Sequence, residues 1–487
     1  MDNVIVKNKN EAYVSIDCTD DIGYELRDAF TFEVPGARFT PQFRAKLWNG
    51  KIYLFNIQKK EMYRGLISHL KSFCEERDYN FIYENNIEEQ ITIDDAKKFI
   101  QTLNCKYEPR EYQIDAFLHA INNKRTLLLS PTASGKSLII YLILRYINVP
   151  KILIIVPTTS LVSQLYTDFA DYGYDSSNNI HTIFSGRDKQ SDMPVVISTW
   201  QSLYQLPATY FHQYDAIIGD EAHLFKAKSL THIMTSLVNA KYRIGTTGTL
   251  DGTKTNKLVL EGLFGPVKKV ITTKELMDQK HVADFSIKCL LLKHPENVCQ
   301  AAKNFTYQQE IEYLVLNESR NKFISNLALS LQGNTLVLYQ YVDKHGKILF
   351  DLINRDDRKV FFIYGKTDVE IREETRHIIE KETNAIIVAS YGTTSTGVNI
   401  QNLHNVIFAS PSKSRIRNLQ SIGRSLRTSE TKTSATLYDI ADDLRYNKKE
   451  NYTLKHLQHR IQIYSEEKFQ FKLYKLDLKG NLNDTNK

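Results

Sequence analysis

From residue 126 onward, short and mostly apolar runs alternate with segments of helical length. This pattern predicts parallel strands that are buried on both faces and joined by crossover helices. The runs fall into two sets, and each set predicts one doubly wound α/β lobe, because right-handed crossovers place helices on both faces of a sheet. The first set is 126–130, 151–157, 195–199, 216–220 and 242–247. The second set is 335–341, 359–365, 385–390, 405–410 and 435–440.

The segments outside these sets have a different pattern. Residues 270–320 are richer in Lys, Glu and Gln, which indicates a connection and a helix leading into the second lobe. The N-terminal segment interleaves aromatic, basic and turn residues, and the Asn49-Gly50 step favours a tight hairpin turn. We therefore expect a small α+β domain over 1–90, a first lobe over 91–275 and a second lobe over 276–487.

Composition indicates a globular protein but does not identify its binding partner. Hydrophobic residues are 42% of the chain and charged residues 24%, which is typical of a globular protein. No apolar run reaches the roughly 18 residues that span a bilayer. The five cysteines form no CxxC pair, so we expect neither a zinc site nor a disulfide. Since we also expect no membrane segment, we predict a cytoplasmic protein. The formal net charge of +7 fits a polyanionic partner but is too small to demonstrate one.

A loop with the residue types of a phosphate-binding loop follows the predicted strand 126–130 and precedes an apolar helix. It consists of Pro131, Thr132, Ala133, Ser134, Gly135, Lys136 and Ser137. Its backbone N–H groups suit phosphates, Lys136 suits the β and γ oxygens of ATP, and Ser137 suits Mg²⁺. A bare Gly-Lys-Ser tripeptide also fits a helix-capping turn, but the strand and helix around it favour an ATP site. Ser130 replaces the usual first glycine.

A pair of carboxylates ends another predicted strand, at Asp220 and Glu221, and Ala222 and His223 follow. At the carboxyl edge of a sheet, Asp220 suits Mg²⁺, and Glu221 suits the orientation or deprotonation of an attacking water. Two acidic residues at a loop start are common in isolation. Their position after a phosphate-binding loop in the same lobe favours a catalytic role.

The second lobe contributes a basic motif that begins at Gln420 and contains Arg424 and Arg427. Residues three apart share one face of a helix, so both guanidinium groups can reach the γ-phosphate of a bound ATP. Such arginines accelerate hydrolysis by several orders of magnitude in other NTPases. Taken alone, the motif also fits a solvated basic helix.

These motifs and their order resemble those of superfamily 2 helicases over nearly all of 109–427. The resemblance implies two tandem RecA-like doubly wound parallel-sheet lobes, with an ATP pocket between them and a small N-terminal α+β domain in front. Further matches stand at 245–249, where the family has the motif that couples hydrolysis to movement, and at 336–341. By resemblance, the nucleotide also contacts Tyr112 and Gln113, the adenine-recognising motif, and Gly397.

The same resemblance places nucleic-acid contacts in three loops. We expect hydroxyl and backbone donors there to grip phosphates without reading sequence, so that binding depends strongly on salt. The residues concerned are Pro157, Thr158, Thr159, Ser198, Thr199, Trp200, Ser395 and Thr396.

Within the superfamily, the chain resembles the recombination helicases of T4-type phages, and this likeness extends through 25–28, 30–43 and 48–50. It implies unwinding and remodelling of forks, D-loops, R-loops and Holliday junctions in the host cytoplasm, with 3′-to-5′ polarity, by a protein we expect to be monomeric. The N-terminal domain is then a second DNA grip, in which basic residues contact phosphates and aromatic residues stack or wedge. The residues of this grip are Arg38, Arg44, Lys46, Trp48 and Lys51. A small core with buried aromatic residues is the alternative.

Other activities also fit the motifs. A double-stranded DNA translocase hydrolyses ATP without separating strands. An RNA helicase is another alternative, because nothing in the motor motifs reads the 2′-hydroxyl. A nucleic-acid clamp with an inactive ATP site is disfavoured, because Lys136, Glu221 and Arg427 are all present.

Overall fold

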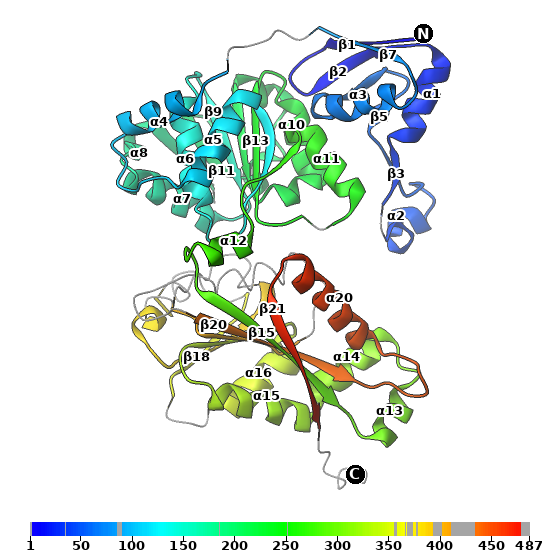
Figure 1. The fold of residues 1–487 in the computed structure, drawn as a ribbon, viewed down its shortest axis with the longest axis vertical. Helices are drawn as coiled ribbons and strands as arrows, with labels where there is room; N and C mark the ends of the chain where they lie inside the picture. The colour runs from blue at the N-terminus through cyan, green and yellow to red at the C-terminus, as the bar shows by residue number, and fades with distance from the viewer. Residues whose placement is uncertain are drawn as a thin grey trace. The chain divides into compact units, whose positions relative to one another are not determined.

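The chain forms two compact units in a computed structural model (Figure 1). One unit is Met1–Ser130 with Gly135–Ile271, and the other is Pro131–Ser134 with Thr272–Lys487. The structure describes residues 2–34, 36–84, 90–184, 186–250, 252–354, 358–365, 367, 374–375, 378–392, 402–410 and 434–478.

The first unit contains a seven-stranded parallel sheet in the order β10-β11-β9-β12-β13-β8-β14. Five of these strands confirm the first predicted set, and the short strands β10 and β14 were not predicted. The strands are β8 (Arg125–Leu129), β9 (Ile152–Val156), β10 (Ile180–Ile183), β11 (Val195–Thr199), β12 (Ala216–Asp220), β13 (Tyr242–Thr247) and β14 (Val267–Lys269).

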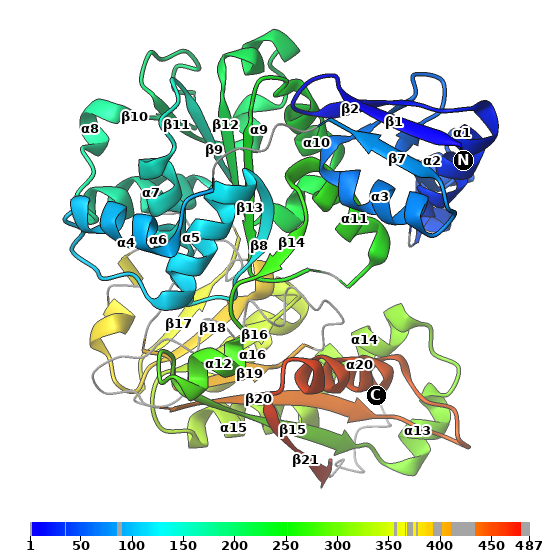
Figure 2. The ribbon, with the colours of Figure 1, turned by 45° about the horizontal axis from the view of Figure 1, so that its top comes forward.

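Helices cover both faces of this sheet (Figure 2). Successive strand residues alternate between the faces, so that Leu128 packs with a first group of helices and Leu127 with a second. The first group is α4 (Ile93–Thr102), α5 (Glu111–Asn123), α6 (Lys136–Tyr146) and α7 (Thr159–Asp171). The second group is α9 (Trp200–Leu203), α10 (Lys228–Ser236) and α11 (Lys254–Phe264). The short helix α8 (Ser176–Asn179) precedes β10.

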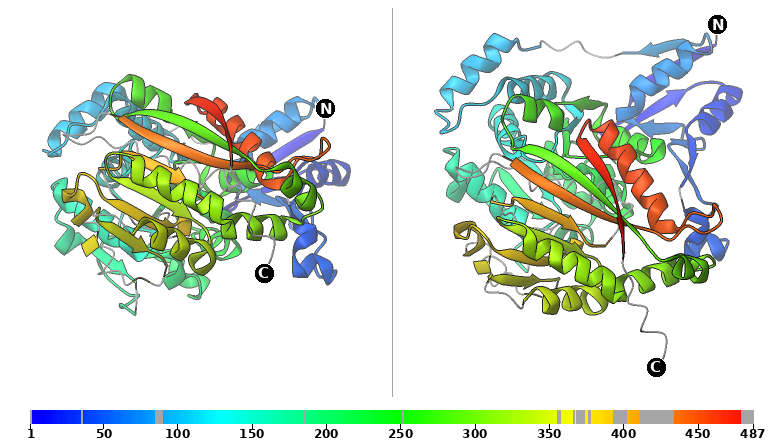
Figure 3. Two further views of the ribbon diagram at one scale, coloured as in Figure 1. Left: turned by 90° about the horizontal axis from the view of Figure 1, so that it is seen from below. Right: turned by 60° about the horizontal axis from the view of Figure 1, so that its bottom comes forward.

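The second unit contains another seven-stranded parallel sheet, in the order β17-β18-β16-β19-β20-β15-β21. Figure 3 shows β15, β20 and β21 side by side. The strands are β15 (Asp284–Lys293), β16 (Thr335–Tyr339), β17 (Val360–Ile363), β18 (Ile386–Ser390), β19 (Asn405–Phe408), β20 (Ser434–Asp443) and β21 (Gln470–Asp477). The helices include α12 (Thr273–Asp278), α13 (Glu296–Ala302), α14 (Tyr307–Leu316), α15 (Glu318–Ser330), α16 (Lys347–Ile353) and α20 (Tyr452–Glu466).

The two large sheets have the same topology. When the strands of each sheet are numbered one to seven along the chain, both orders read 3-4-2-5-6-1-7. This match confirms the prediction of two tandem RecA-like lobes. It also corrects the assignment of 270–320 as a connection and a helix, because β15 within that segment is the counterpart of β8. The first half of β15 alternates exposed polar and buried apolar residues, which hid the strand in a polar-rich segment.

The N-terminal region is a separate small α+β domain, as predicted. Its mixed sheet has the order β5-β6-β2-β1-β7, and β3 pairs with β4 in a second, antiparallel sheet. The elements are β1 (Asn3–Asn8), β2 (Tyr13–Asp17), α1 (Asp20–Ala29), β3 (Thr31–Glu33), α2 (Pro41–Arg44), β4 (Lys51–Tyr53), β5 (Phe55–Asn56), β6 (Glu61–Tyr63), α3 (Ile67–Glu75) and β7 (Asn80–Tyr83).

The predicted hairpin turn at Asn49-Gly50 is wrong. The two residues end a long connection between β3 and β4 that contains α2. Gly50 has a φ of +77°, and its carbonyl accepts a hydrogen bond from the Val34 N–H at 2.8 Å. The side chain of Asn49 accepts from the Lys51 N–H at 3.1 Å. This asparagine therefore forms a local turn that returns the chain to β4 rather than the centre of a two-residue hairpin.

The N-terminal domain packs directly against the first lobe, and one continuous apolar cluster contains residues from both. A Cβ atom on Gly65 would lie 2.0 Å from the carbonyl oxygen of Glu261 in α11, so only glycine fits this contact. Nearby, the carboxylate of Glu11 bonds the guanidinium groups of Arg64 and Arg125. Burial lowers the pKa of Arg125 to about 10, and the negative charge of Glu11 opposes this shift.

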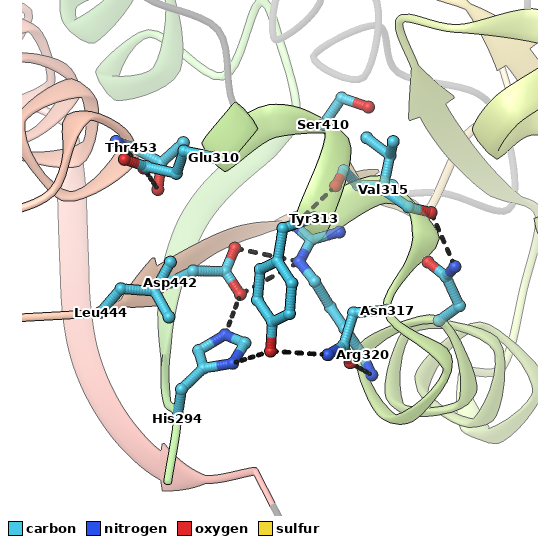
Figure 4. Close-up of polar contacts among 12 residues, drawn as sticks. His294, Glu310, Tyr313, Val315, Asn317, Arg320, Ser410, Asp442, Leu444 and Thr453 are labelled. Atoms are coloured by element: carbon cyan, nitrogen blue, oxygen red, sulfur yellow. Dashed lines mark hydrogen bonds and ion pairs between the residues drawn. The ribbon is translucent and has the colours of Figure 1, made fainter. Parts of the chain in front are cut away.

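A buried polar cluster stabilises the second lobe (Figure 4). Nε of Arg320 in α15 donates to both carboxylate oxygens of Asp442 at 3.0 and 2.9 Å, and Nε2 of His294 lies 2.9 Å from Oδ1. Burial alone would raise the pKa of Asp442, but the charge of Arg320 and the hydrogen bond from His294 lower it below its ordinary value. The cluster joins α15 to the ends of β15 and β20.

Candidate active site

Three adjacent strands of the first lobe bring the candidate catalytic residues to one edge. β12, β13 and β8 are neighbours in the sheet, and Asp220 of β12 is paired in register with Thr246 of β13. The N–H of Ser130, just after β8, donates to the carbonyl of Thr247 at 2.9 Å. Ligands of open α/β sheets bind beyond the carboxyl ends of the strands, and the predicted phosphate loop begins at this edge.

The predicted phosphate loop turns into α6 through Gly135, whose φ is +75°. The positive φ favours glycine, and a Cβ atom there would lie 2.3 Å from Nε2 of Gln113, so that side chain would have to move. Lys136 is the first residue of α6, and its ammonium group lies 3.4 Å from the carbonyl of Ser130. Ser134 is buried, and its hydroxyl donates to the Pro131 carbonyl at 2.6 Å. The positive end of the α6 dipole and Lys136 make this loop suitable for phosphate.

Gln113 joins the start of α5 to the phosphate loop. Its side-chain oxygen accepts from the Arg110 N–H at 2.8 Å, and its amide nitrogen donates to the Gly135 carbonyl at 3.4 Å. Tyr112, beside it, accepts a 2.9 Å hydrogen bond from the Arg110 guanidinium. The structure thus joins Gln113 of the predicted adenine-recognising pair to the loop. Gln113 is buried and Tyr112 is partly exposed.

The two carboxylates have different environments. Asp220 is buried at the end of β12 and accepts a 2.8 Å hydrogen bond from the Thr246 hydroxyl. Burial and then the charge of Glu221 raise the pKa of Asp220, while Lys136 and Thr246 oppose the shift. Glu221 has a φ of +50°, in the left-handed region that non-glycine residues seldom adopt, and its carboxylate lies 3.2 Å from Nδ1 of His223.

These residues fit Mg²⁺. The Asp220 carboxylate and the Ser137 hydroxyl supply the oxygen donors that this ion prefers, and Mg²⁺ commonly takes few protein ligands beside phosphates. A divalent cation would also offset the repulsion that raises the pKa of Asp220. No group of three or more His, Cys, Asp or Glu side chains is placed to hold a metal ion among the residues that the structure describes.

Sequence reasoning missed three contacts at this edge. The bond from Thr246 to Asp220 follows from the register of β12 and β13, which the sequence does not give. His223 bonds the Thr247 hydroxyl through Nδ1 at 3.0 Å, although its position in the motif was recognised. The hydroxyl of Tyr172 lies 2.9 Å from that of Ser137, and no motif signals this contact because it depends on the packing of α7 on α6.

The predicted nucleic-acid loops of the first lobe differ in exposure. Thr158 caps α7 by accepting from the Leu161 N–H, and the exposed Thr159 begins the helix. Gln201 donates to the Pro157 carbonyl at 3.3 Å, which ties two of these loops together. Trp200 is partly exposed at the start of α9.

The expectation that the Ser198 and Thr199 hydroxyls grip phosphate is corrected by their burial. The Ser198 hydroxyl donates inward, to the carbonyls of Ile183 and Thr199. The Thr199 hydroxyl lies 3.0 Å from that of Ser202. These groups therefore stabilise the loop from inside.

The segment 36–51, which we call the aromatic–basic loop, projects apolar side chains into solvent. Phe39 is 63% exposed and Leu47 is 81% exposed. The guanidinium of Arg38 lies 4.9 Å from the Phe39 ring centroid, and the partly exposed Trp48 donates to the Lys51 carbonyl at 2.9 Å. An open depression is lined by Arg38, Phe43, Arg44, Lys46, Leu47, Trp48 and Asn49. The alternative of a small core with all its aromatic residues buried does not describe this loop.

The remaining predicted site residues lie outside the described residues. They are Ser395, Thr396, Gly397, Gln420, Arg424 and Arg427.

Comparisons with known proteins agree with this architecture. Residues 106–252 match the family described as Type III restriction enzyme, res subunit, and 319–429 match the helicase conserved C-terminal domain. Residues 3–84 match the family described as DNA helicase UvsW, N-terminal. A DNA-bound Type ISP restriction-modification enzyme, LlaBIII, shares the fold at a TM-score of 0.57 and 17% identity, over 78% of this chain and 32% of that chain.

With two RecA-like lobes and these family matches, the chain is a superfamily 2 helicase and a nucleic-acid-dependent ATPase. It is 37% identical to the ATP-dependent DNA helicase uvsW of Enterobacteria phage T4, over 96% of this chain and 98% of that protein. The crystal structure of T4 UvsW has a TM-score of 0.52 and 35% identity, over 98% of this chain and 100% of that chain. The chain therefore belongs to the UvsW family of DNA helicases, which confirms the resemblance found in the sequence. None of the helices described here is long and apolar enough to cross a bilayer.

Proposed function

We propose that this helicase unwinds and remodels branched DNA during phage recombination, repair and replication. The observation that carries the proposal is the exposed aromatic–basic loop, on a domain that packs against an ATPase lobe. Stacking and phosphate contact suit a junction, where bases are accessible beside paired strands. The phage T4 relative is an ATP-dependent DNA helicase, which supports DNA as the substrate.

At the ATP site, Lys136 neutralises the β and γ phosphates and the loop residues Thr132, Ser134 and Gly135 cradle them. Tyr112 and Gln113 recognise the adenine base, a role that the contact of Gln113 with Gly135 supports. Glu221 orients and deprotonates the attacking water. When bound at Ser137 and Asp220, Mg²⁺ would supply charge neutralisation for the phosphates.

Gln420, Arg424, Arg427 and Gly397 complete the nucleotide chemistry, by the family resemblance. The two arginines offset charge on the γ-phosphate as it is transferred, which is the role of cations of this kind in other NTPases. Single substitutions of Arg424 and Arg427 to Ala should lower kcat by several orders of magnitude while nucleotide affinity changes little.

DNA is gripped by hydroxyl and backbone N–H donors at Thr158, Thr159, Ser395 and Thr396. Pro157 and Trp200 contribute apolar contacts from the loops of the first lobe. In the aromatic–basic loop, Arg38, Arg44, Lys46 and Lys51 contact phosphates. Trp48, whose ring nitrogen donates to the Lys51 carbonyl, stacks or wedges at the junction. The grip is independent of sequence, because these contacts read no base edges. We further propose that the protein acts as a monomer in the host cytoplasm, and that it also displaces RNA from R-loops.

A strand-displacement assay tests the proposal on forked DNA, blunt duplex DNA and duplex RNA, with and without ATP. We expect ATP-dependent displacement that is fastest on the fork. Lys136→Ala should abolish displacement, because it removes a contact with the phosphates of ATP. It should spare fork binding, because Lys136 is not part of the aromatic–basic loop. Equal rates on RNA would favour an RNA helicase. ATP hydrolysis on duplex DNA without strand separation would favour a translocase.

A further inference from the structure

Tyr172 contacts the phosphate loop from outside the known motifs. It caps the C-terminal end of α7, and its hydroxyl lies 2.9 Å from the hydroxyl of Ser137, the second residue of α6. Ser137 is the residue that we propose as a Mg²⁺ ligand.

Packing holds the Tyr172 side chain in place. Its backbone N–H donates to the Asp168 carbonyl at 3.0 Å, and its own carbonyl accepts from the Tyr141 hydroxyl at 3.1 Å. Its ring meets the rings of Tyr141 and Tyr107 edge to face, at centroid distances of 5.3 and 5.7 Å. The position of the Tyr172 hydroxyl is therefore fixed by α6, by α7 and by the segment before α5.

The two hydroxyls have complementary hydrogen-bonding needs. Burial raises the pKa of Tyr172 to about 12, so the phenol is neutral at physiological pH. A serine hydroxyl has one proton and two lone pairs. When Ser137 donates its proton to the Tyr172 oxygen, both of its lone pairs stay available for a cation. Partners behind metal ligands commonly fix ligand orientation in this way, and their loss costs roughly 10-fold to 100-fold in metal affinity.

We propose that Tyr172 is a positioning residue that accepts the hydroxyl proton of Ser137 and turns a Ser137 lone pair toward the Mg²⁺ of bound ATP. This inference rests on the proposed role of Ser137. Tyr172 itself touches neither nucleotide nor metal, so its loss should weaken the contribution of Mg²⁺ without changing the contacts of the phosphate loop with nucleotide.

Nucleotide binding tests the inference without relying on turnover. A fluorescent N-methylanthraniloyl-ADP is titrated into the full-length protein in excess Mg²⁺ and, separately, in EDTA. The ratio of the two dissociation constants gives the affinity gained from Mg²⁺. Tyr172→Phe keeps the ring and should lower this gain about tenfold, while affinity in EDTA stays within twofold of the wild type. Tyr107→Phe keeps the ring that packs on Tyr172 and removes only a hydroxyl, so its gain should match the wild type.

Ser137→Ala distinguishes the proposed Mg²⁺ site from the proposed role of Tyr172. If it abolishes the Mg²⁺ gain, and the Ser137→Ala/Tyr172→Phe double variant loses nothing further, the two residues act as one unit. If Ser137→Ala retains the full gain, the proposed Mg²⁺ site is wrong and the role of Tyr172 is overturned with it. If Ser137→Ala loses the gain while Tyr172→Phe keeps it, or if Tyr107→Phe loses as much as Tyr172→Phe, only the role of Tyr172 is overturned.

Discussion

The hydroxyl of Thr246 donates a 2.8 Å hydrogen bond to Oδ1 of Asp220 and so joins the ends of two adjacent strands. This bond lowers the pKa of a carboxyl group that burial raises. Thr246→Val should therefore raise the pKa of Asp220, because the ionised form loses a donor. We expect kcat for ATP hydrolysis to fall about tenfold near neutral pH, as a charge-assisted hydrogen bond is lost. The acid limb of the pH–rate profile should move to higher pH.

Two variants check this assignment. Thr246→Ser retains a hydroxyl and should recover most of the activity. Thr255→Val removes another buried threonine hydroxyl, on α11, whose 3.4 Å bond is to the Glu33 carbonyl, and it should leave the profile unchanged. An unshifted acid limb in Thr246→Val would contradict the role given to this bond.

The exposed phenylalanines of the aromatic–basic loop should matter for DNA rather than for ATP. Replacing both Phe39 and Phe43 by Ala removes two stacking surfaces, each worth about 1–3 kcal/mol per base. We expect the affinity for forked DNA, measured by fluorescence anisotropy, to fall at least tenfold, with kcat at saturating DNA unchanged. Tyr24→Ala is the matched control, because Tyr24 is 54% exposed in the same domain but outside the loop. Equal losses in the control and the double variant would show a general surface effect.

The ion cluster at the junction between the N-terminal domain and the first lobe should contribute to stability. Glu11→Ala leaves the buried Arg125 without its carboxylate partner. Breaking a buried pair on one side costs about 3 kcal/mol, which urea unfolding would measure. Glu75→Ala removes the exposed pair with Lys71 and should cost under about 0.5 kcal/mol. Similar costs for the two variants would mean that the Glu11 cluster is not effectively buried.

His345 should make the second lobe sensitive to acid. Burial, and then the positive charge of Arg320, lower the pKa of His345 from 6.5 to about 3, while Asp442 opposes the shift. Between these two values the unfolded chain binds one more proton than the folded chain, so the free energy of unfolding falls as pH decreases. The slope from this group is at most about 1.4 kcal/mol per pH unit.

His345→Gln removes this titration. The unfolding free energy of the variant, measured by urea at pH 7, 6 and 5, should therefore decline less steeply with acid than that of the wild type. Parallel declines would contradict the lowered pKa, because they would mean that His345 binds its proton equally in the folded and unfolded chain. The comparison between variant and wild type cancels the carboxylates that titrate in the same range.

The sequence was sufficient for the strands whose apolar runs are continuous, such as β9 and β12, because a strand buried on both faces cannot contain many polar residues. It was insufficient for β15, whose first half alternates, and for β10 and β14, which are too short to stand out from neighbouring loops. The hairpin at Asn49-Gly50 was wrong because a dipeptide preference does not report how far apart the paired strands lie in sequence.

The residues of the candidate site also fall into those that the sequence identified and those that it did not. Motif spacing identified Lys136, Asp220 and Glu221, because each stands at a strand end or helix start that the chain itself specifies. Thr246 and Tyr172 act through contacts between elements, and those contacts depend on strand register and helix packing. Ser198 has a residue type suited to phosphate, but β11 turns its hydroxyl inward, and a single sequence does not show which face of a strand a hydroxyl occupies.

The contact of Gly65 with Glu261 is made between main chains and leaves no space for a side chain at that glycine. The attachment of the N-terminal domain is thus largely independent of the residues displayed at 36–51. Mutations in the aromatic–basic loop can alter which DNA junctions the protein prefers without weakening the packing of the N-terminal domain on the first lobe. In variants selected for new substrates, substitutions should accordingly accumulate in the aromatic–basic loop while Gly65 stays unchanged.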